Sequence, residues 1–200
     1  MILDSANSQD SYGKKILQEI SISSDFARWT VELSRSGLFG RVIEIGCGLG
    51  NNLDALNEQC MDLWASDYNE EYLRTVALEK KYLSGTILWD IEKPPNIEEQ
   101  FDSFFCSNVL EHVEDDEIAL SNIAKIPNIK TGVIIVPSNN HFYSRIDKNL
   151  GHYRRYNKKM LLKKLARAGF EVLEINSFNK IGTLGWIGQS IILKRDTLGR

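Results

Sequence analysis

The sequence predicts an α/β protein with a doubly wound, mostly parallel β-sheet and helices on both faces. Short runs rich in β-branched residues alternate with amphipathic helical patterns along the 200 residues, which implies right-handed crossovers between parallel strands. Several of these runs are apolar at consecutive positions, as in strands that are covered on both faces. A glycine-rich turn, 46-GCGLG-50, joins the first run to a helical pattern.

An N-terminal helical arm is predicted for residues 1–40, followed by one domain over residues 41–200. The arm contains a helical pattern at residues 24–36, with Phe26, Trp29 and Leu33 as its apolar positions. Six strands are predicted in the domain, at residues 41–46, 62–67, 86–90, 101–110, 132–138 and 170–178.

Helical patterns with recognisable ends lie between these strands. The helix at 69–82 begins with Asn69 as its cap. The helix at 114–126 places Ala119, Ile123 and Ile126 on one face. The helix at 157–169 ends at Gly169, which suits a left-handed C-cap. The least regular segment of the domain is 138–156, between the fifth and sixth predicted strands.

Composition and charge argue against several classes of protein. A formal net charge of -3 gives no global attraction to nucleic acid or to an anionic membrane surface. The first residues lack the apolar centre of a signal peptide, and no apolar run approaches the roughly 20 residues that span a bilayer. We therefore expect a cytoplasmic protein with neither a nucleic-acid nor a membrane partner.

Cysteine and histidine spacing predicts no metal site. Cys47, Cys60 and Cys106 show none of the close spacing of a metal knuckle and are expected to be buried free thiols. The three histidines, His112, His141 and His152, fall in separate predicted elements.

The glycine-rich turn follows a strand that carries a carboxylate, Glu44. Gly46, Gly48 and Gly50 let a ligand approach the backbone at the carboxyl edge of the sheet. The dinucleotide pattern G-x-G-x-x-G does not fit because its third glycine would fall on Asn51, and no Lys-Ser or Lys-Thr of a phosphate loop follows. Glu44 favours a ligand with an ammonium group; the alternative is a turn that binds nothing.

Two more carboxylates end the second and third predicted strands. Asp67 can accept hydrogen bonds from both hydroxyls of a ribose, although an Asp at a strand end is often a helix cap. Tyr68 offers a flat face to an adenine. Asp90 can accept from an exocyclic amine, with Ile91 as an apolar neighbour. Because no basic residue lies in these motifs, the three acids together predict a pocket for a neutral or cationic nucleoside.

In the order and spacing of these motifs, residues 42–172 resemble the class I S-adenosylmethionine-dependent methyltransferases, particularly their small-molecule branch. The stretches that carry the resemblance are 42-VIEIGCGLG-50, Asp67, Asp90 and 105-FCSNVLEHVEDD-116. The resemblance implies a Rossmann-like sheet and S-adenosyl-L-methionine as the cofactor. It assigns to the cofactor site Glu44, Gly46, Cys47, Gly48, Gly50, Asp67, Tyr68, Asp90, Ile91, Asn108 and Leu110.

The sequence departs from that family at its C-terminal end. The family's sheet usually closes with a seventh, antiparallel strand, and only 190-SIILKR-195 remains to form it. The last antiparallel strand is therefore expected to be incomplete or absent.

The substrate side is predicted to involve the insert at 138–156, where GHYRRY resembles a segment near the pocket mouth of a subgroup of these methyltransferases. His152 is the candidate base because its unperturbed pKa is near ~6.5; the alternative is a structural hydrogen bond. Substrate-binding roles are assigned to His112, Tyr153, Arg154, Arg155 and Tyr156. The two arginines suit an anionic acceptor; the alternative is pairing with the acidic residues at 114–117.

We expect methyl transfer to a small molecule, with a hydroxyl as the accepting group. Exocyclic amines of nucleobases are disfavoured, because SNVLEH stands where enzymes of that kind carry an N-P-P-Y type segment. Two other functions remain open: a non-catalytic protein that binds S-adenosylmethionine, and a nicotinamide-dependent oxidoreductase. The sequence predicts no oligomeric state.

Overall fold

The structure is a computed structural model that describes residues 24–60 and 62–178. Within these residues, five parallel strands form one sheet in the order β3-β2-β1-β4-β5. They are β1 (Arg41–Ile45), β2 (Asp62–Asp67), β3 (Gly85–Leu88), β4 (Ser103–Ser107) and β5 (Thr131–Ile135). The first five predicted strands and the doubly wound order are thereby confirmed, since the chain moves from β1 to one edge of the sheet and then returns to build the other.

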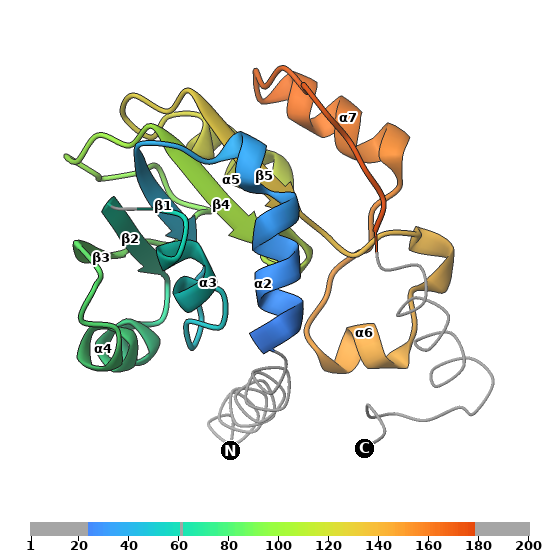
Figure 1. Ribbon diagram of the computed structural model, residues 1–200. Coiled ribbons are helices and arrows are strands. Elements are labelled where there is room, and N and C mark those ends of the chain that lie inside the picture. Colours follow the sequence, from blue (N-terminus) through green and yellow to red (C-terminus); the bar gives the residue numbers. More distant parts are fainter. Residues whose placement is uncertain (1–23, 61, 179–200) are drawn as a thin grey trace, which may run out of the picture.

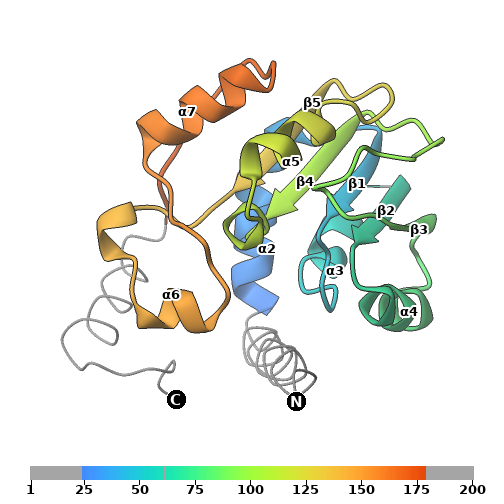
Figure 2. The ribbon, with the colours of Figure 1, turned by 180° about the vertical axis from the view of Figure 1, so that it is seen from behind.

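Helices cover both faces of this sheet (Figures 1 and 2). On one face, a hydrophobic core forms under α2 (Ser24–Leu33), α3 (Leu53–Asn57) and α4 (Glu70–Glu79). On the other face, a second core forms under α5 (Asp116–Ile123) and α7 (Lys158–Arg167). The short helix α6 (Arg145–Asn149) lies to the side, beyond the ends of β4 and β5 (Figure 1).

The central strand β1 alternates between the two cores. Ile43 and Ile45 are fully buried in the core under α5 and α7, whereas Val42 is fully buried in the core under α2 to α4. Glu44 points to the same face as Val42, because side chains two residues apart share a face of a strand. A carboxylate thus occupies a buried position of β1 on the face where Val42 packs into the core.

Helix ends follow the predicted capping residues. Asn69 caps α4, with its side chain accepting from the N–H groups of Glu71 and Tyr72. Asn157 caps α7 through Met160, and Gly169 takes a positive φ of 88° just after that helix. These caps are local interactions, which is why the sequence predicted them.

The sixth predicted strand, at residues 170–178, is wrong: this segment forms no strand in the structure. Its apolar residues Phe170, Val172 and Ile175 pack partly buried against the core under α5 and α7. These side chains therefore pack on one side of the segment, and its backbone forms no hydrogen-bonded ladder with a neighbouring strand. The possible last strand at 190–195 lies outside the described residues.

Two glycines of the edge strands sit directly under aromatic rings of their neighbours. Gly85 of β3 pairs with Trp64 of β2, and Gly132 of β5 pairs with Phe104 of β4. A Cβ atom on Gly132 would lie 2.1 Å from Cε1 of Phe104, and one on Gly85 would lie 2.4 Å from Cζ3 of Trp64. Each ring thus fills the space that a side chain would take on the edge strand.

We expect Gly132→Ala to lower the free energy of unfolding by roughly 1–3 kcal/mol, because the added methyl forces the Phe104 ring out of its packed position. Urea denaturation followed by circular dichroism measures the change. Thr86→Ala, at an exposed position of β3, is the control and should cost much less. Unchanged stability of the Gly132 variant would show that the ring moves freely.

Candidate active site

The glycine turn lies at the carboxyl end of β1 and requires its glycines. Gly46, Gly48 and Gly50 have φ values of 70°, 53° and 78°, in the left-handed region that side chains disfavour. A Cβ atom on Gly46 would also lie 2.5 Å from Cγ2 of Val109. The N–H groups of Gly46 and Cys47 donate to the carbonyl of Ser66 at 2.8 and 2.9 Å, so the turn is tied to the end of β2.

Asp67 fastens this turn to the start of α4. Its Oδ2 accepts from the N–H of Gly48 at 2.8 Å, and its Oδ1 accepts from the N–H of Asn69 at 2.9 Å. Burial raises the pKa of this carboxyl, against the lowering effect of the backbone donors. The helix cap is Asn69, so Asp67 is not the cap itself. A carboxylate has about four acceptor positions, which leaves Asp67 the capacity to accept from a ligand.

Glu44 is buried beside the turn with one oxygen unpartnered. Its Oε1 accepts from Nδ2 of Asn52 at 2.9 Å, whereas Oε2 has no hydrogen-bond partner among the described residues. Burial, and then the charge of Asp67, raise the pKa of Glu44 to about 8, although the Asn52 bond lowers it. Sequence reasoning missed Asn52, which follows the last glycine of the turn by two positions.

The third acid, Asp90, has a basic partner just beyond its motif. Lys93 pairs with it at 3.0 Å between Nζ and Oδ2, and the N–H of Glu92 donates to its Oδ1 at 3.0 Å. The role of Asp90 at the adenine edge stays a prediction. Tyr68 is 72% exposed beside Asp67, whereas Ile91 is buried.

The segment after β4 returns the chain to the same edge. Asn108 adopts a positive φ of 54°, and its N–H donates to the carbonyl of Ile135 at 2.9 Å, beyond the end of the β4–β5 ladder. Leu110 begins the short helix η2 (Leu110–His112) and is fully buried in the core. Cys47 is buried as expected, and burial raises the pKa of its thiol.

Two residues predicted to bind the acceptor are instead internal. Arg155 is buried, and its Nε donates to Oδ1 of Asp147 at 2.7 Å. Tyr156 is also buried, and its hydroxyl donates to the carboxylate of Asp116 at 2.7 Å. Protein groups occupy these polar atoms, and the substrate-binding roles of Arg155 and Tyr156 stay predictions.

Arg154 follows the alternative that the sequence left open. Its Nη1 and Nη2 donate to the carbonyls of Val113 and Glu114, both at 2.6 Å, and Nη1 lies 3.4 Å from Oδ2 of Asp116. Arg154 is thus held by the backbone carbonyls just before α5. Because Arg154 and Arg155 both bind protein groups, they no longer support the prediction of an anionic acceptor. Tyr153 remains 54% exposed and stays a predicted contact of the acceptor.

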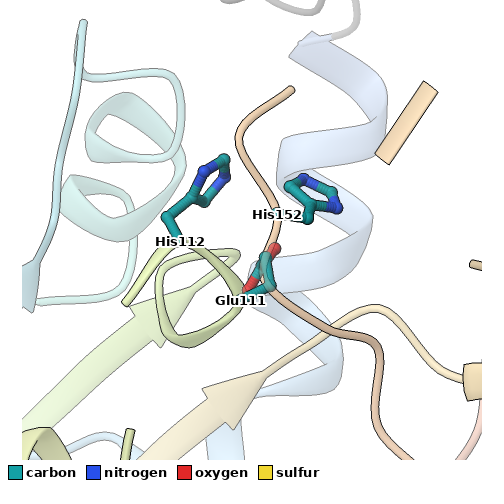
Figure 3. A group of neighbouring side chains, drawn as sticks. All are labelled: Glu111, His112 and His152. Carbon is teal, nitrogen blue, oxygen red and sulfur yellow. The ribbon is translucent and has the colours of Figure 1, made fainter. Parts of the chain in front are cut away.

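The fold joins two histidines that are 40 positions apart in the sequence. The rings of His112 and His152 are perpendicular, with 4.6 Å between their centroids. Figure 3 shows them together with Glu111. Nδ1 of His152 lies 3.0 Å from Oδ1 of Asp147, which is the structural hydrogen bond considered as an alternative to catalysis. Sequence reasoning missed Glu111 and Asp147, because nothing local in the sequence pairs them with a histidine.

No helix among the described residues is long and apolar enough to cross a membrane.

Comparison with known proteins finds a matching family model. Residues 43–135, from β1 to the end of β5, match a family model described as a methyltransferase domain. No curated protein matches the sequence significantly.

Solved structures share the fold at low identity. An S-adenosylmethionine-dependent methyltransferase from Clostridium acetobutylicum is 17% identical, with a TM-score of 0.57 and 78% of this chain and 83% of that chain covered. The YcgJ protein from Bacillus subtilis is 18% identical, with a TM-score of 0.53 and coverage of 64% and 60%. The [4+2]-cyclase SpnF is 18% identical, with a TM-score of 0.60 and coverage of 76% and 58%.

At these identities the structural neighbours show the fold alone, and the chain spans only about 60% of the length of two of them. The family match covers the glycine turn, Asp67 and the segment after β4, which are the parts that line the carboxyl edge of the sheet. Residues 43–135 therefore match a methyltransferase domain, and the structure shares the fold of a solved S-adenosylmethionine-dependent methyltransferase.

Proposed function

We propose that the protein transfers the methyl group of S-adenosylmethionine to a hydroxyl of a small molecule that binds beside His112 and His152. The observation that carries the proposal is the unpartnered Oε2 of Glu44 at the glycine turn. A buried acceptor without a donor costs about 1–3 kcal/mol, and the ammonium group of the cofactor supplies a charged donor. The match to a methyltransferase domain supports the same cofactor.

The residues at the carboxyl edge fit the parts of this cofactor. The glycine turn leaves room beside the backbone for the methionine portion, with Glu44 toward its ammonium group. Asp67 accepts from the ribose hydroxyls. Tyr68 follows Asp67 at the end of β2 and suits the adenine face, and Asp90 lies after β3, where it suits the adenine edge. Cys47, Ile91, Asn108 and Leu110 stay predicted neighbours of the cofactor.

The reaction needs alignment and the removal of one proton. When bound, S-adenosylmethionine supplies an electrophilic methyl group on a positively charged sulfur. The acceptor oxygen forms the new bond to the methyl carbon, and the electron pair of the broken carbon–sulfur bond stays on sulfur. His152 activates the hydroxyl through Nε2, the nitrogen that faces away from its bond to Asp147.

Small acceptors fit the charge of the protein. Its net charge of -3 offers no general attraction to a polyanion, and both arginines near the site are committed to protein groups. The description of SpnF as a cyclase says that this fold also serves another reaction in that protein. The experiment must therefore detect a methylated product, not only cofactor binding.

Asp67→Asn should raise the dissociation constant of S-adenosylmethionine roughly 10- to 150-fold, because a charge-assisted hydrogen bond to the ribose contributes about 1.5–3 kcal/mol. Isothermal titration calorimetry measures the change. Asp62→Asn is the matched control, since Asp62 begins the same strand and pairs with Arg41. Equal affinities for the wild-type protein and a folded Asp67 variant would refute the assignment.

Glu44→Gln should weaken S-adenosylmethionine and its demethylated product, both of which carry the ammonium group, and leave adenosine binding nearly unchanged. With a pKa of about 8, Glu44 is about nine-tenths protonated at pH 7, so an ammonium ligand that favours the ionised form releases a proton on binding. Calorimetry in two buffers of different ionisation enthalpy should show nearly one proton released by the wild-type protein and little by the variant. Equal proton release by both would give Glu44 a purely structural role.

Methyl transfer itself is tested with isotopically labelled S-adenosylmethionine and a panel of phenols, catechols, hydroxy acids and amines. We expect labelled product from hydroxylated acceptors only. His152→Ala should lower kcat more than it raises the acceptor KM, whereas His141→Ala, at an exposed position, should change neither. Cofactor binding without any labelled product across the panel would favour the non-catalytic alternative.

A further inference from the structure

Three potential metal ligands meet where the segment after β4 touches the segment after α6. Glu111 and His112 lie in η2, and His152 follows α6. One donor atom from each residue lies within 4.8 Å of the other two, and Figure 3 shows Glu111 between the two imidazole rings in that view. The N–H of Tyr153 donates to the carbonyl of Glu111 at 2.6 Å, which fixes His152 beside η2.

Glu111 carries the second unpartnered carboxylate oxygen of the protein's described part. The residue is 1% exposed, and its Oε2 has no hydrogen-bond partner. No ion pair involves this carboxylate in the described residues, so a ligand that brings positive charge would satisfy it.

His152 is already held as a metal-binding histidine would be. Asp147 accepts from its Nδ1 at 3.0 Å, which assigns the proton to Nδ1 and leaves the lone pair on Nε2. Asp147 is itself fixed by Nε of Arg155 at 2.7 Å and by the N–H of Ser144 at 2.8 Å. A carboxylate behind a histidine orients the ring and raises its basicity toward a metal.

His112 supplies the second imidazole, and it lies on the side of the group that solvent reaches. Its ring lies 4.6 Å from that of His152, centroid to centroid, and a neutral imidazole offers a lone pair for coordination. The residue as a whole is exposed, His152 is half-buried and Glu111 is buried. A cation can therefore enter from the side of His112.

The charges around the three ligands also suit a dication. Glu111 and Asp147 contribute two negative charges when ionised, and Arg155 contributes one positive charge. Metal ligands bind in their deprotonated forms, so Glu111 is ionised and both histidines are neutral when the ion is bound. The group then carries one net negative charge, which offsets part of the charge of the ion.

We propose that Glu111, His112 and His152 bind one divalent transition-metal cation, with Zn²⁺ as the representative ion. Two imidazoles and one carboxylate favour zinc, iron, cobalt or nickel over magnesium or calcium, which prefer oxygen ligands. Two atoms that share such a metal in tetrahedral geometry at about 2.0–2.2 Å lie about 3.3–3.6 Å apart. The ligand atoms, which lie within 4.8 Å of one another, therefore approach one another by up to about 1.5 Å when the ion binds.

Three protein ligands leave at least one coordination position open. This step rests on the proposed function: an acceptor hydroxyl in the open position would be held beside the cofactor edge and would ionise more easily on the cation. Its proton would leave to solvent water on the side of His112. His152 then acts through the metal, because an imidazole nitrogen cannot bind a cation and a proton together.

Metal binding is tested on the full chain, stripped with a chelator and dialysed, by calorimetric titration with Zn²⁺ in the absence of cofactor. We expect one equivalent to bind, and His112→Ala, His152→Ala and Glu111→Gln each to raise its dissociation constant at least about tenfold. His141→Ala, an exposed histidine outside the group, should bind as the wild-type protein does. Circular dichroism checks that each variant is folded, and His112→Ala is the safest because its side chain is exposed.

Cobalt provides a second readout that a structural role would not change. The visible absorption of protein loaded with Co²⁺ should report coordination by imidazole and should be lost in His112→Ala. No binding by the wild-type protein, or equal binding by the folded His112 and His152 variants, would overturn the metal site. S-adenosylmethionine titrated into the metal-free protein tests the cofactor site, and the assay for labelled product tests methyl transfer, so that the metal site can fail while the proposed function stands.

Discussion

The carboxyl edge of the sheet depends on one carboxylate that accepts two backbone hydrogen bonds. Asp67 receives the N–H of Gly48 on one oxygen and that of Asn69 on the other. The first bond fixes the glycine turn after β1, and the second fixes the entry to α4. Since Gly46 is also in close approach to Val109, the same arrangement determines where the chain after β4 passes. The cofactor side and the acceptor side are thus connected through a few backbone contacts.

Two buried glutamates flank this edge in a similar physical state. Glu44 ends its side chain beside the turn, Glu111 lies after β4, and each retains one oxygen without a partner in the described residues. Such groups lower the stability of a fold, and they persist where a ligand completes them. One of the two lies on the side assigned to the cofactor, and the other on the side assigned to the acceptor. Both therefore mark positions where the protein is incomplete without its ligands.

The sequence predicted what local pattern and chain order determine. The first five strands, the cap Asn69 and the left-handed Gly169 all follow from residue type and spacing. The strand predicted at 170–178 failed because an alternating pattern describes one-sided packing as well as a ladder, and Phe170 obtains its burial from Phe104.

Non-local partners were beyond what the sequence could show. Arg155 and Arg154 look alike in GHYRRY, yet one is buried on Asp147 and the other clamps the carbonyls before α5. The meeting of His112 with His152 likewise depends on a backbone hydrogen bond from Tyr153 to Glu111. The sequence shows which segment carries a charged residue or a histidine. The tertiary fold determines which group that side chain contacts.

The burial of Glu44 has a practical consequence for handling the protein without its cofactor. Its pKa rises from the ordinary 4.5 to about 8 in the folded chain, so the folded state holds a proton that the unfolded chain has lost at intermediate pH. The stability contributed by this group is complete below about 4.5 and decreases as the pH rises toward about 8. Carboxylates held by basic partners, such as Asp62 and Asp147, impose the opposite trend in more acidic solution. Unliganded preparations should therefore keep best in mildly acidic buffer, whereas alkaline storage charges a buried carboxyl group.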